Sequence, residues 1–129
     1  MDIEHVAFNV AAPPAVAEWY TKHLGMRVVR SIPLPPHTHF LSDQSGRVVL
    51  EFYHRPEASV PDYHALDPLV LHLAFTTSDL AGTRARLLAA GAAGAGEVTV
   101  TPAGDELAFL RDPWGLPIQL VRRARPLGG

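Results

Sequence analysis

An internal repeat constrains the fold of this chain more than any other feature of its sequence. Residues 5–8 read His-Val-Ala-Phe and residues 72–75 read His-Leu-Ala-Phe, at an offset of 67. Leu-Glu-Phe at 50–52 resembles Ile-Gln-Leu at 118–120, at an offset of 68, and Gly25 and Gly91 are 66 apart. Self-similarity at a nearly constant offset indicates duplication, and two copies within 129 residues predict paired modules instead of a solenoid.

Hydrophobic patterning predicts the same order of elements in each half. In the first half, we expect a strand over 3–10, a helix from Pro13 to Leu24, and strands over 26–31, 37–43 and 47–54. In the second half, we expect a strand over 70–76, a helix capped by Ser78 or Asp79 and ending near Ala90, and strands over 97–101, 106–110 and 117–122. The predicted class is α+β, with a βαβββ module over 1–55, a linker over 56–68, a second βαβββ module over 69–123 and a tail over 124–129.

Composition excludes several classes of protein. The chain has no cysteine, so disulfides, thiolate metal sites and thiol nucleophiles are ruled out. Its formal net charge is −2 and it has no long basic run, so we expect no nucleic-acid partner. It has neither a signal-peptide pattern nor an apolar run of about 20 residues, so we expect a cytoplasmic protein without a membrane partner.

Four residues at repeat-equivalent strand positions form the main candidate site. Side chains alternate faces along a strand, and each of these strands combines one strongly apolar face with another that carries a single coordinating group. If the halves are related by a pseudo-twofold axis, these groups converge, and they are His5, Glu51, His72 and Gln119. Imidazole and carboxylate groups bind one divalent ion of Zn, Ni, Co, Fe or Mn. A single strand His or Glu usually has no such role, so the prediction rests on the four positions together.

A further set of polar and aromatic residues are candidates for the substrate pocket: Asn9, His37, His39, Tyr53 and Trp114. His37 and His39 are expected to share one face of the third strand and to contact an anionic substrate. Trp114, in an Asp-Pro-Trp-Gly turn, suits the pocket rim or ordinary packing equally well. His54 is expected on the apolar face, and His64 in an exposed loop.

Five segments carry a resemblance to a known family. They are Ile-Glu-His-Val-Ala-Phe-Asn-Val at 3–10, Trp-Tyr at 19–20 with His-Leu-Gly-Met at 23–26, Val-Leu-Glu-Phe at 49–52, Leu-His-Leu-Ala-Phe at 71–75, and Phe-Leu-Arg-Asp-Pro-Trp-Gly-Leu-Pro-Ile-Gln-Leu at 109–120. Here the chain resembles the vicinal oxygen chelate superfamily, which includes glyoxalase I, bleomycin resistance proteins and ring-cleaving dioxygenases. The resemblance implies a curved mixed sheet around a central cleft, metal ligands at the four positions above, a small-molecule substrate and a homodimer.

Gln119 departs from the pattern, because glyoxalase I and many relatives have glutamate there. A glutamine can coordinate through its carbonyl oxygen but cannot accept a proton, so Glu51 is the candidate catalytic base. Three functions stay open on the sequence. They are a metal-dependent lyase or isomerase acting on a substrate that chelates through oxygen, an Fe(II) ring-cleaving dioxygenase, and a non-catalytic binder of a small molecule or drug.

Overall fold

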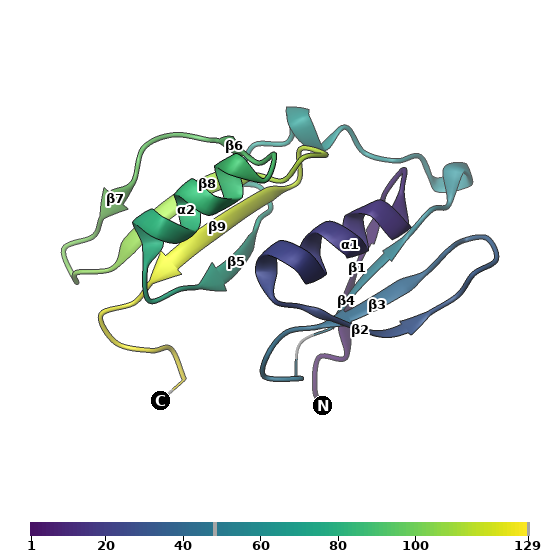
Figure 1. Ribbon diagram of the computed structural model, residues 1–129, viewed down its shortest axis with the longest axis horizontal. Helices are drawn as coiled ribbons and strands as arrows, with labels where there is room; N and C mark the ends of the chain where they lie inside the picture. Colours follow the sequence, from purple (N-terminus) through teal and green to yellow (C-terminus); the bar gives the residue numbers. More distant parts are fainter. Residues whose placement is uncertain (48, 129) are drawn as a thin grey trace. The chain divides into compact units, whose positions relative to one another are not determined.

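The computed structural model describes residues 1–47 and 49–128 of the chain. The chain divides into two compact units, Met1–Pro61 (unit 1) and Asp62–Gly129 (unit 2), and each contains a helix packed on one face of a mixed sheet (Figure 1). The predicted α+β class is therefore confirmed. Position 48 of the predicted fourth strand and position 129 of the predicted tail lie outside the described residues.

Unit 1 has a four-stranded sheet in the order β1-β4-β3-β2. The first and last strands of the unit pair in parallel, and the other two pairings are antiparallel. The elements in chain order are β1 (His5–Asn9), α1 (Pro13–Leu24), β2 (Arg27–Ser31), β3 (His39–Ser42), β4 (Val49–Tyr53) and the 3-10 turn η1 (Pro56–Ala58).

Helix α1 begins and ends where its sequence predicts. Pro13 occupies the first turn, where a missing backbone N–H costs nothing, because that N–H would have no partner within the helix. Gly25 ends the helix in the left-handed conformation, with φ 66° and its N–H donated to the Tyr20 carbonyl. Glycine takes up this conformation without steric cost, so the chain can turn directly into β2.

The core of unit 1 lies between α1 and one face of the sheet. Strand alternation buries Phe8, Leu41, Leu50 and Phe52 on that face. The Phe52 ring is fully buried and lies 5.1 Å from the ring of Tyr20 on the helix. Burying a large apolar side chain of this kind stabilises the fold by about 1.5–3 kcal/mol, so this layer holds α1 on the sheet and leaves the opposite face for polar groups.

Unit 2 repeats this arrangement with a divided strand. Its sheet has the order β5-β9-β8-β6, with β7 paired to β8, and the first and last strands are again parallel. Helix α2 packs on β8 and β9 (Figure 1). The elements are the 3-10 turn η2 (Tyr63–Ala65), β5 (Leu73–Thr76), α2 (Leu80–Ala89), β6 (Ala93–Gly94), β7 (Thr99–Val100), β8 (Glu106–Arg111) and β9 (Pro117–Arg122).

Several strands are shorter than predicted, and three of these differences have a clear cause in the backbone. The predicted strand over 97–101 is present only as β7, because the chain bends at Gly96, where φ is 103°. Residues before His72 form a turn in which the Val70 N–H donates to the Asp67 carbonyl, so β5 is shorter than predicted. His37 has φ 57° and lies in a turn before β3, not in the strand.

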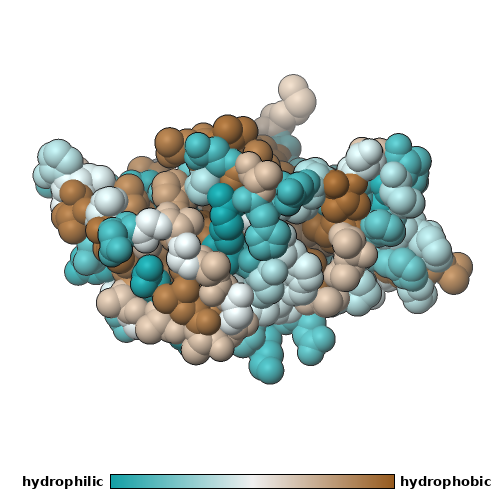
Figure 2. Space-filling model, turned by 90° about the horizontal axis from the view of Figure 1, so that it is seen from above, coloured by the Kyte–Doolittle hydropathy of each residue, from teal (hydrophilic) through white to brown (hydrophobic). Residues whose placement is uncertain are grey.

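Apolar side chains remain exposed in both units, including Ile3 and Leu34 in unit 1 and Leu69 and Val70 in unit 2. Hydrophobic and hydrophilic side chains are interspersed on the face seen in Figure 2. Scattered exposure of this kind is ordinary for folded proteins and does not by itself mark a binding surface. In the described part of the chain, neither helix is long and apolar enough to cross a bilayer.

The turn between β8 and β9 is held by a buried carboxylate. Asp112 is only 2% exposed, and its Oδ1 accepts hydrogen bonds from the N–H groups of Trp114 and Leu116, both at 2.9 Å. Gly115, between these residues, has φ 94°, and its α-carbon faces His64 so closely that an added Cβ would lie 2.6 Å from the His64 backbone nitrogen. Backbone geometry therefore explains the Asp and the Gly of the Asp-Pro-Trp-Gly sequence.

We predict that Gly115→Ala destabilises the protein by about 1–3 kcal/mol more than Gly96→Ala, because overpacking against fixed backbone adds to the strain of a positive φ. Gly96 is the matched control, since its φ is 103° and a Cβ added there would have no other atom within 4 Å. Urea unfolding followed by circular dichroism measures both variants. Equal losses of unfolding free energy would contradict the steric argument.

Candidate functional site

In unit 1, the polar face of the sheet brings together His5 and Glu51. Glu51 on β4 lies between Ala7 on β1 and Phe40 on β3 in the strand register. His5 Nε2 lies 3.4 Å from Glu51 Oε1, and the two side chains are 34% and 18% exposed. Both side chains are partly exposed, and their neighbour on β1 is the small Ala7, so the pair is accessible to a small ligand.

The hydrogen bonds of His5 decide which of its nitrogens can coordinate. Glu4 Oε1 accepts a hydrogen bond from His5 Nδ1 at 2.8 Å. A neutral imidazole that carries its proton on Nδ1 has its lone pair on Nε2, the atom that faces Glu51. The His5 ring also stands edge-on to Phe40, with ring centroids 5.6 Å apart. Both contacts hold the ring in an orientation that suits a metal ligand.

In unit 2, His72 has the same local arrangement. It lies just before β5, and its Nδ1 donates to the Pro68 carbonyl at 2.7 Å. A carbonyl only accepts, so the neutral ring again carries its lone pair on Nε2. The ring of His72 stands edge-on to Phe109, at 4.9 Å between centroids, and Phe109 lies opposite Gln119 in the register. Gln119 is buried, at 9% exposure, and pairs with Ala74 on its other side.

Two phenylalanines, Phe40 and Phe109, belong to the site although the sequence did not predict them. Each contacts the histidine of its own unit and lies opposite the predicted ligand on the last strand of that unit. Their positions, Phe40 and Phe109, differ by 69, close to the offsets of 67 and 68 that link the histidines and the Glu51 and Gln119 positions. A search for residues repeated at this offset would have identified both phenylalanines from the sequence. The repeated unit is therefore a histidine, an alanine, a phenylalanine and one variable polar residue.

Asn9 is engaged with the backbone. Its side-chain amide donates to the carbonyls of Arg55 at 2.7 Å and Ser59 at 3.3 Å, and its Oδ1 accepts from the Arg55 N–H at 2.8 Å. It is 8% exposed. These contacts fix the chain after β4, which gives Asn9 a structural role; its part in a substrate pocket stays a prediction.

The structure separates the remaining predicted pocket residues. Tyr53 lies two residues after Glu51 on β4 and shares its face. His39 pairs with Phe52, so it lies on the helix side of the sheet, away from Glu51, and its Nδ1 donates to the His37 carbonyl at 2.7 Å. His37 and His39 therefore do not share a strand face as expected.

Trp114 is held through its backbone N–H by the Asp112 carboxylate, and His54 is held through its ring by a backbone carbonyl. Trp114 is half-buried in the turn that Asp112 stabilises. His54 Nδ1 donates to the Val10 carbonyl at 2.9 Å, which ties β4 to the end of β1. Of the predicted pocket residues in unit 1, Tyr53 thus has the clearest access to the face that carries His5 and Glu51.

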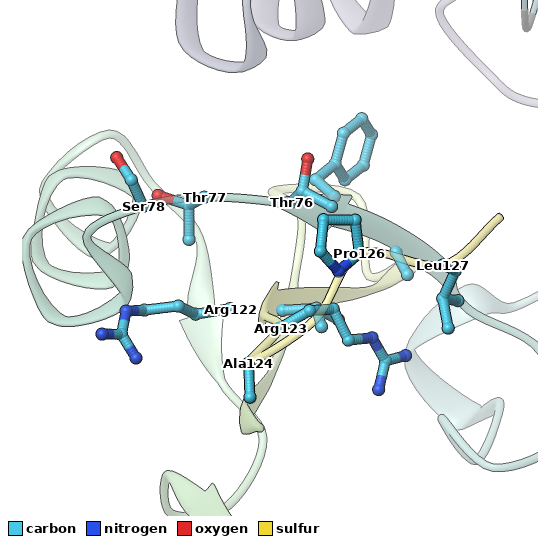
Figure 3. Close-up of a pocket in the computed structure, with 11 residues that line it drawn as sticks. Thr76, Thr77, Ser78, Arg122, Arg123, Ala124, Pro126 and Leu127 are labelled. Carbon is cyan, nitrogen blue, oxygen red and sulfur yellow. The ribbon is translucent and has the colours of Figure 1, made fainter. Parts of the chain in front are cut away.

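Unit 2 contains a pocket of about 880 Å³ at the ends of β5 and β9 (Figure 3). Thr76 and Val121, in its wall, follow Ala74 and Gln119 by two residues and so share their face of the sheet. The wall also includes a segment of hydroxyl side chains, two arginines and part of the C-terminal tail: Thr77, Ser78, Arg122, Arg123, Ala124, Pro126 and Leu127.

The arginine head groups of this pocket are paired with acidic residues. Figure 3 shows the Arg122 and Arg123 guanidinium groups pointing in opposite directions. Arg122 pairs with Glu106 at 2.8 Å and Arg123 with Asp105 at 3.0 Å. The positive charge on this wall is thus compensated locally, and the pocket is not a strong anion site.

A family model for the Glyoxalase/Bleomycin resistance protein/Dioxygenase superfamily matches residues 2–120. The chain belongs to this superfamily. The resemblance drawn from the His-x-Ala-Phe repeats and the Asp-Pro-Trp-Gly block is therefore confirmed.

Solved structures of superfamily proteins have the same fold. A glyoxalase family protein from Bacillus cereus aligns with a TM-score of 0.81 and 16% identity, over 95% of this chain and 93% of that one. One from Enterococcus faecalis is 28% identical, with a TM-score of 0.68 over 93% and 96%. TnmS3, an antibiotic binding protein from Streptomyces sp. CB03234, is 18% identical, with a TM-score of 0.71 over 96% and 97%. No curated protein is significantly similar to the chain in sequence.

Members of the superfamily typically bind a divalent metal, and the His5–Glu51 pair fits one. Two ligands about 2.1 Å from one ion, at angles between about 90° and 109°, lie about 3.0–3.4 Å apart. The separation of 3.4 Å between Nε2 and Oε1 falls in that range. Within the described part of either unit, no three His, Asp or Glu side chains come together closely enough to hold a metal. The pair thus supplies two ligands, and further positions need other donors.

We predict that Asp105 holds the start of the C-terminal tail at neutral pH and releases it in acid. The Ala124 N–H, at 2.8 Å, and then Arg123 lower the pKa of Asp105 below its ordinary value. A lowered pKa means that the attachment is complete above the ordinary aspartate range and is lost as pH falls through the lowered pKa.

The Ala124 amide chemical shift, followed by NMR against pH, measures this attachment. It should stay constant down to the ordinary aspartate range and move only at lower pH. Asp105→Asn should abolish this movement, and Asp62→Asn, at an exposed aspartate of the same unit, should leave it unchanged. An unaltered titration in Asp105→Asn would refute the assignment.

Proposed function

We propose that this superfamily member is a divalent-metal-dependent lyase or isomerase that acts on a small substrate with two adjacent oxygen atoms. The observation that carries the proposal is the distance of 3.4 Å between His5 Nε2 and Glu51 Oε1 on an accessible sheet face. His5 and Glu51 would hold the ion, and the sequence prediction adds His72 and Gln119. When bound, the ion supplies Lewis-acid stabilisation of negative charge on substrate oxygens.

The chain's own residues supply the proton chemistry. Glu51 is the one carboxylate among the four predicted ligands, so it is the candidate base that removes a proton from a substrate carbon next to a carbonyl. Gln119, its counterpart in the repeat, carries no charge and cannot accept a proton. The ligand set therefore does not support a reaction in which one carboxylate removes the proton and another returns it. A single base can carry the same proton between adjacent carbons.

Charge on the ligand set favours an anionic substrate. His5 and His72 are neutral when they coordinate, so Glu51 contributes the single negative charge among the four predicted ligands. A divalent ion held by this set keeps one net positive charge, whereas a second glutamate would cancel it. A substrate carboxylate or enediol oxygen would complete the neutralisation.

A non-catalytic binder is the second candidate. Phe40 and Phe109 offer apolar rings on the faces that carry Glu51 and Gln119, and such rings suit a flat organic molecule. An Fe(II) ring-cleaving dioxygenase is the third, since two imidazoles and one carboxylate are also its ligand types. Oxygen consumption with Fe²⁺ and a panel of catechols separates it from the other two.

We predict that the protein binds one divalent metal per chain and that Glu51→Gln weakens this binding at least about tenfold, because a charged oxygen ligand is lost. Equilibrium dialysis with Zn²⁺ and Ni²⁺, followed by elemental analysis, measures the affinity. Glu97→Gln, at an exposed glutamate of unit 2, is the control and should bind metal like the unmodified chain. Absence of metal uptake by the unmodified chain would exclude this function.

We also predict that the metal-loaded protein catalyses exchange of deuterium from solvent into carbons adjacent to the carbonyl of some α-hydroxy ketones or 2-oxo acids. Proton NMR of the small molecules follows the exchange. Glu51→Gln should lower the rate by about 10²–10⁴-fold, the usual contribution of a positioned base. Tight ligand binding with no exchange in any compound would favour the binder.

A further inference from the structure

A β-bulge in β2 changes which side chains face the ligand side of unit 1. The register between β2 and β3 pairs Arg27 with Ser42 and Arg30 with Phe40, with the shift between Val28 and Arg30. Residues three apart in a regular strand lie on opposite faces, but the extra residue of the bulge puts both arginines on one face. That face carries Phe40, and the contact of Arg27 Nη2 with Ser42 Oγ at 3.5 Å agrees with this orientation.

Arg30 therefore completes a row of four side chains across the sheet. The paired positions are Ala7, Glu51, Phe40 and Arg30, on β1, β4, β3 and β2. Neighbouring strands are about 4.8 Å apart, so the Arg30 and Glu51 α-carbons are separated by about 10 Å. In this row Phe40 lies between Glu51, whose carboxylate faces His5, and Arg30 on the outer strand.

The duplicated row in unit 2 has no such charges. Ala74, Gln119 and Phe109 are paired across β5, β9 and β8, and the Ala95 N–H donates to the Phe109 carbonyl at 3.1 Å. Alanine and phenylalanine are thus repeated between the two rows, whereas Glu51 is replaced by Gln119 and Arg30 by Ala95. Both charged members of the row occur in unit 1, beside His5.

The Arg30 guanidinium is available to a ligand. Its side chain is exposed, and no carboxylate in the described part of the chain lies within ion-pair distance of it. A guanidinium presents two parallel N–H groups that match the two oxygens of a carboxylate. One guanidinium balances one carboxylate, and Phe40, its neighbour in the row, is an apolar surface suited to a short carbon chain.

We propose that Arg30 binds a carboxylate group of the substrate, several atoms from the two oxygens that the substrate presents to the metal at His5 and Glu51. The inference rests on the proposed function and specifies its substrate as a short-chain acid that is anionic at the end away from the chelating oxygens. The bulge is the structural device that brings this residue to the site. Arg30 is accordingly a residue for substrate binding and specificity.

Two small molecules differ only in the group that Arg30 would bind. Both 2-oxoglutarate and 2-oxopentanoate present a 2-oxo acid, and only the former has a second carboxylate. Isothermal titration calorimetry of the zinc-loaded protein at low ionic strength gives both dissociation constants. We expect 2-oxoglutarate to bind about five- to tenfold more tightly, the effect of one charge-assisted bidentate contact at an exposed site.

Arg30→Gln should bring the two dissociation constants together without changing that of 2-oxopentanoate, and Arg30→Lys should keep part of the preference. Arg47→Gln is the matched control, because it removes the same charge from an exposed position of the same unit before β4. It should keep the full preference. The proposal would be overturned if the unmodified protein bound both acids equally or bound neither. It would also be overturned if the preference for 2-oxoglutarate persisted in Arg30→Gln.

The same titrations in zinc-free protein separate this inference from the function on which it rests. If 2-oxopentanoate binds equally with and without zinc, the metal-dependent function fails. A preference for 2-oxoglutarate that still depends on Arg30 would then support the carboxylate contact by itself. Conversely, zinc-dependent binding of both acids with equal affinity would leave the metal function standing and refute the role of Arg30.

Discussion

The parallel pairing of the first and last strands in each unit is the constraint on which the candidate site depends. It places Ala7 next to Glu51 in unit 1 and Ala74 next to Gln119 in unit 2. In both units the third strand of the sheet then contributes a phenylalanine opposite the variable polar residue. A one-residue slip of this register would move Glu51 to the buried side, where an unpartnered carboxylate is strongly unfavourable.

Local hydrogen bonds then prepare each histidine. His5 is oriented by Glu4, its neighbour in the sequence, and His72 by the carbonyl of Pro68, four residues earlier. The acceptors differ, but both accept a hydrogen bond from Nδ1, which leaves Nε2 of each ring as the nitrogen that can coordinate when the ring is neutral. The two units therefore share a hydrogen-bond acceptor at Nδ1 of the histidine, although the acceptors themselves are unrelated.

Because the two units are duplicates, a comparison of their equivalent residues shows which side chains occur in only one unit. The rows of paired residues across the two sheets have the same alanine and the same phenylalanine, and we attribute these shared residues to packing that both sheets require. Where the rows differ, at Glu51 against Gln119 and Arg30 against Ala95, the change is one of charge. The chemistry proposed for this superfamily member is accordingly concentrated in unit 1, although its fold is built twice.

The duplication, the α+β class and the limits of α1 could be predicted from the amino-acid sequence, because they follow from hydrophobic period, proline and glycine, all of which act locally. The sequence also predicted that His5 and Glu51 meet, since alternation along two strands fixes their faces. Tertiary structure alone decided the bulge that turns Arg30 toward Phe40, the turn that removes His37 from β3, and the divided strand of β6 and β7. These depend on pairing between distant segments and on backbone angles that a pattern of residues does not specify.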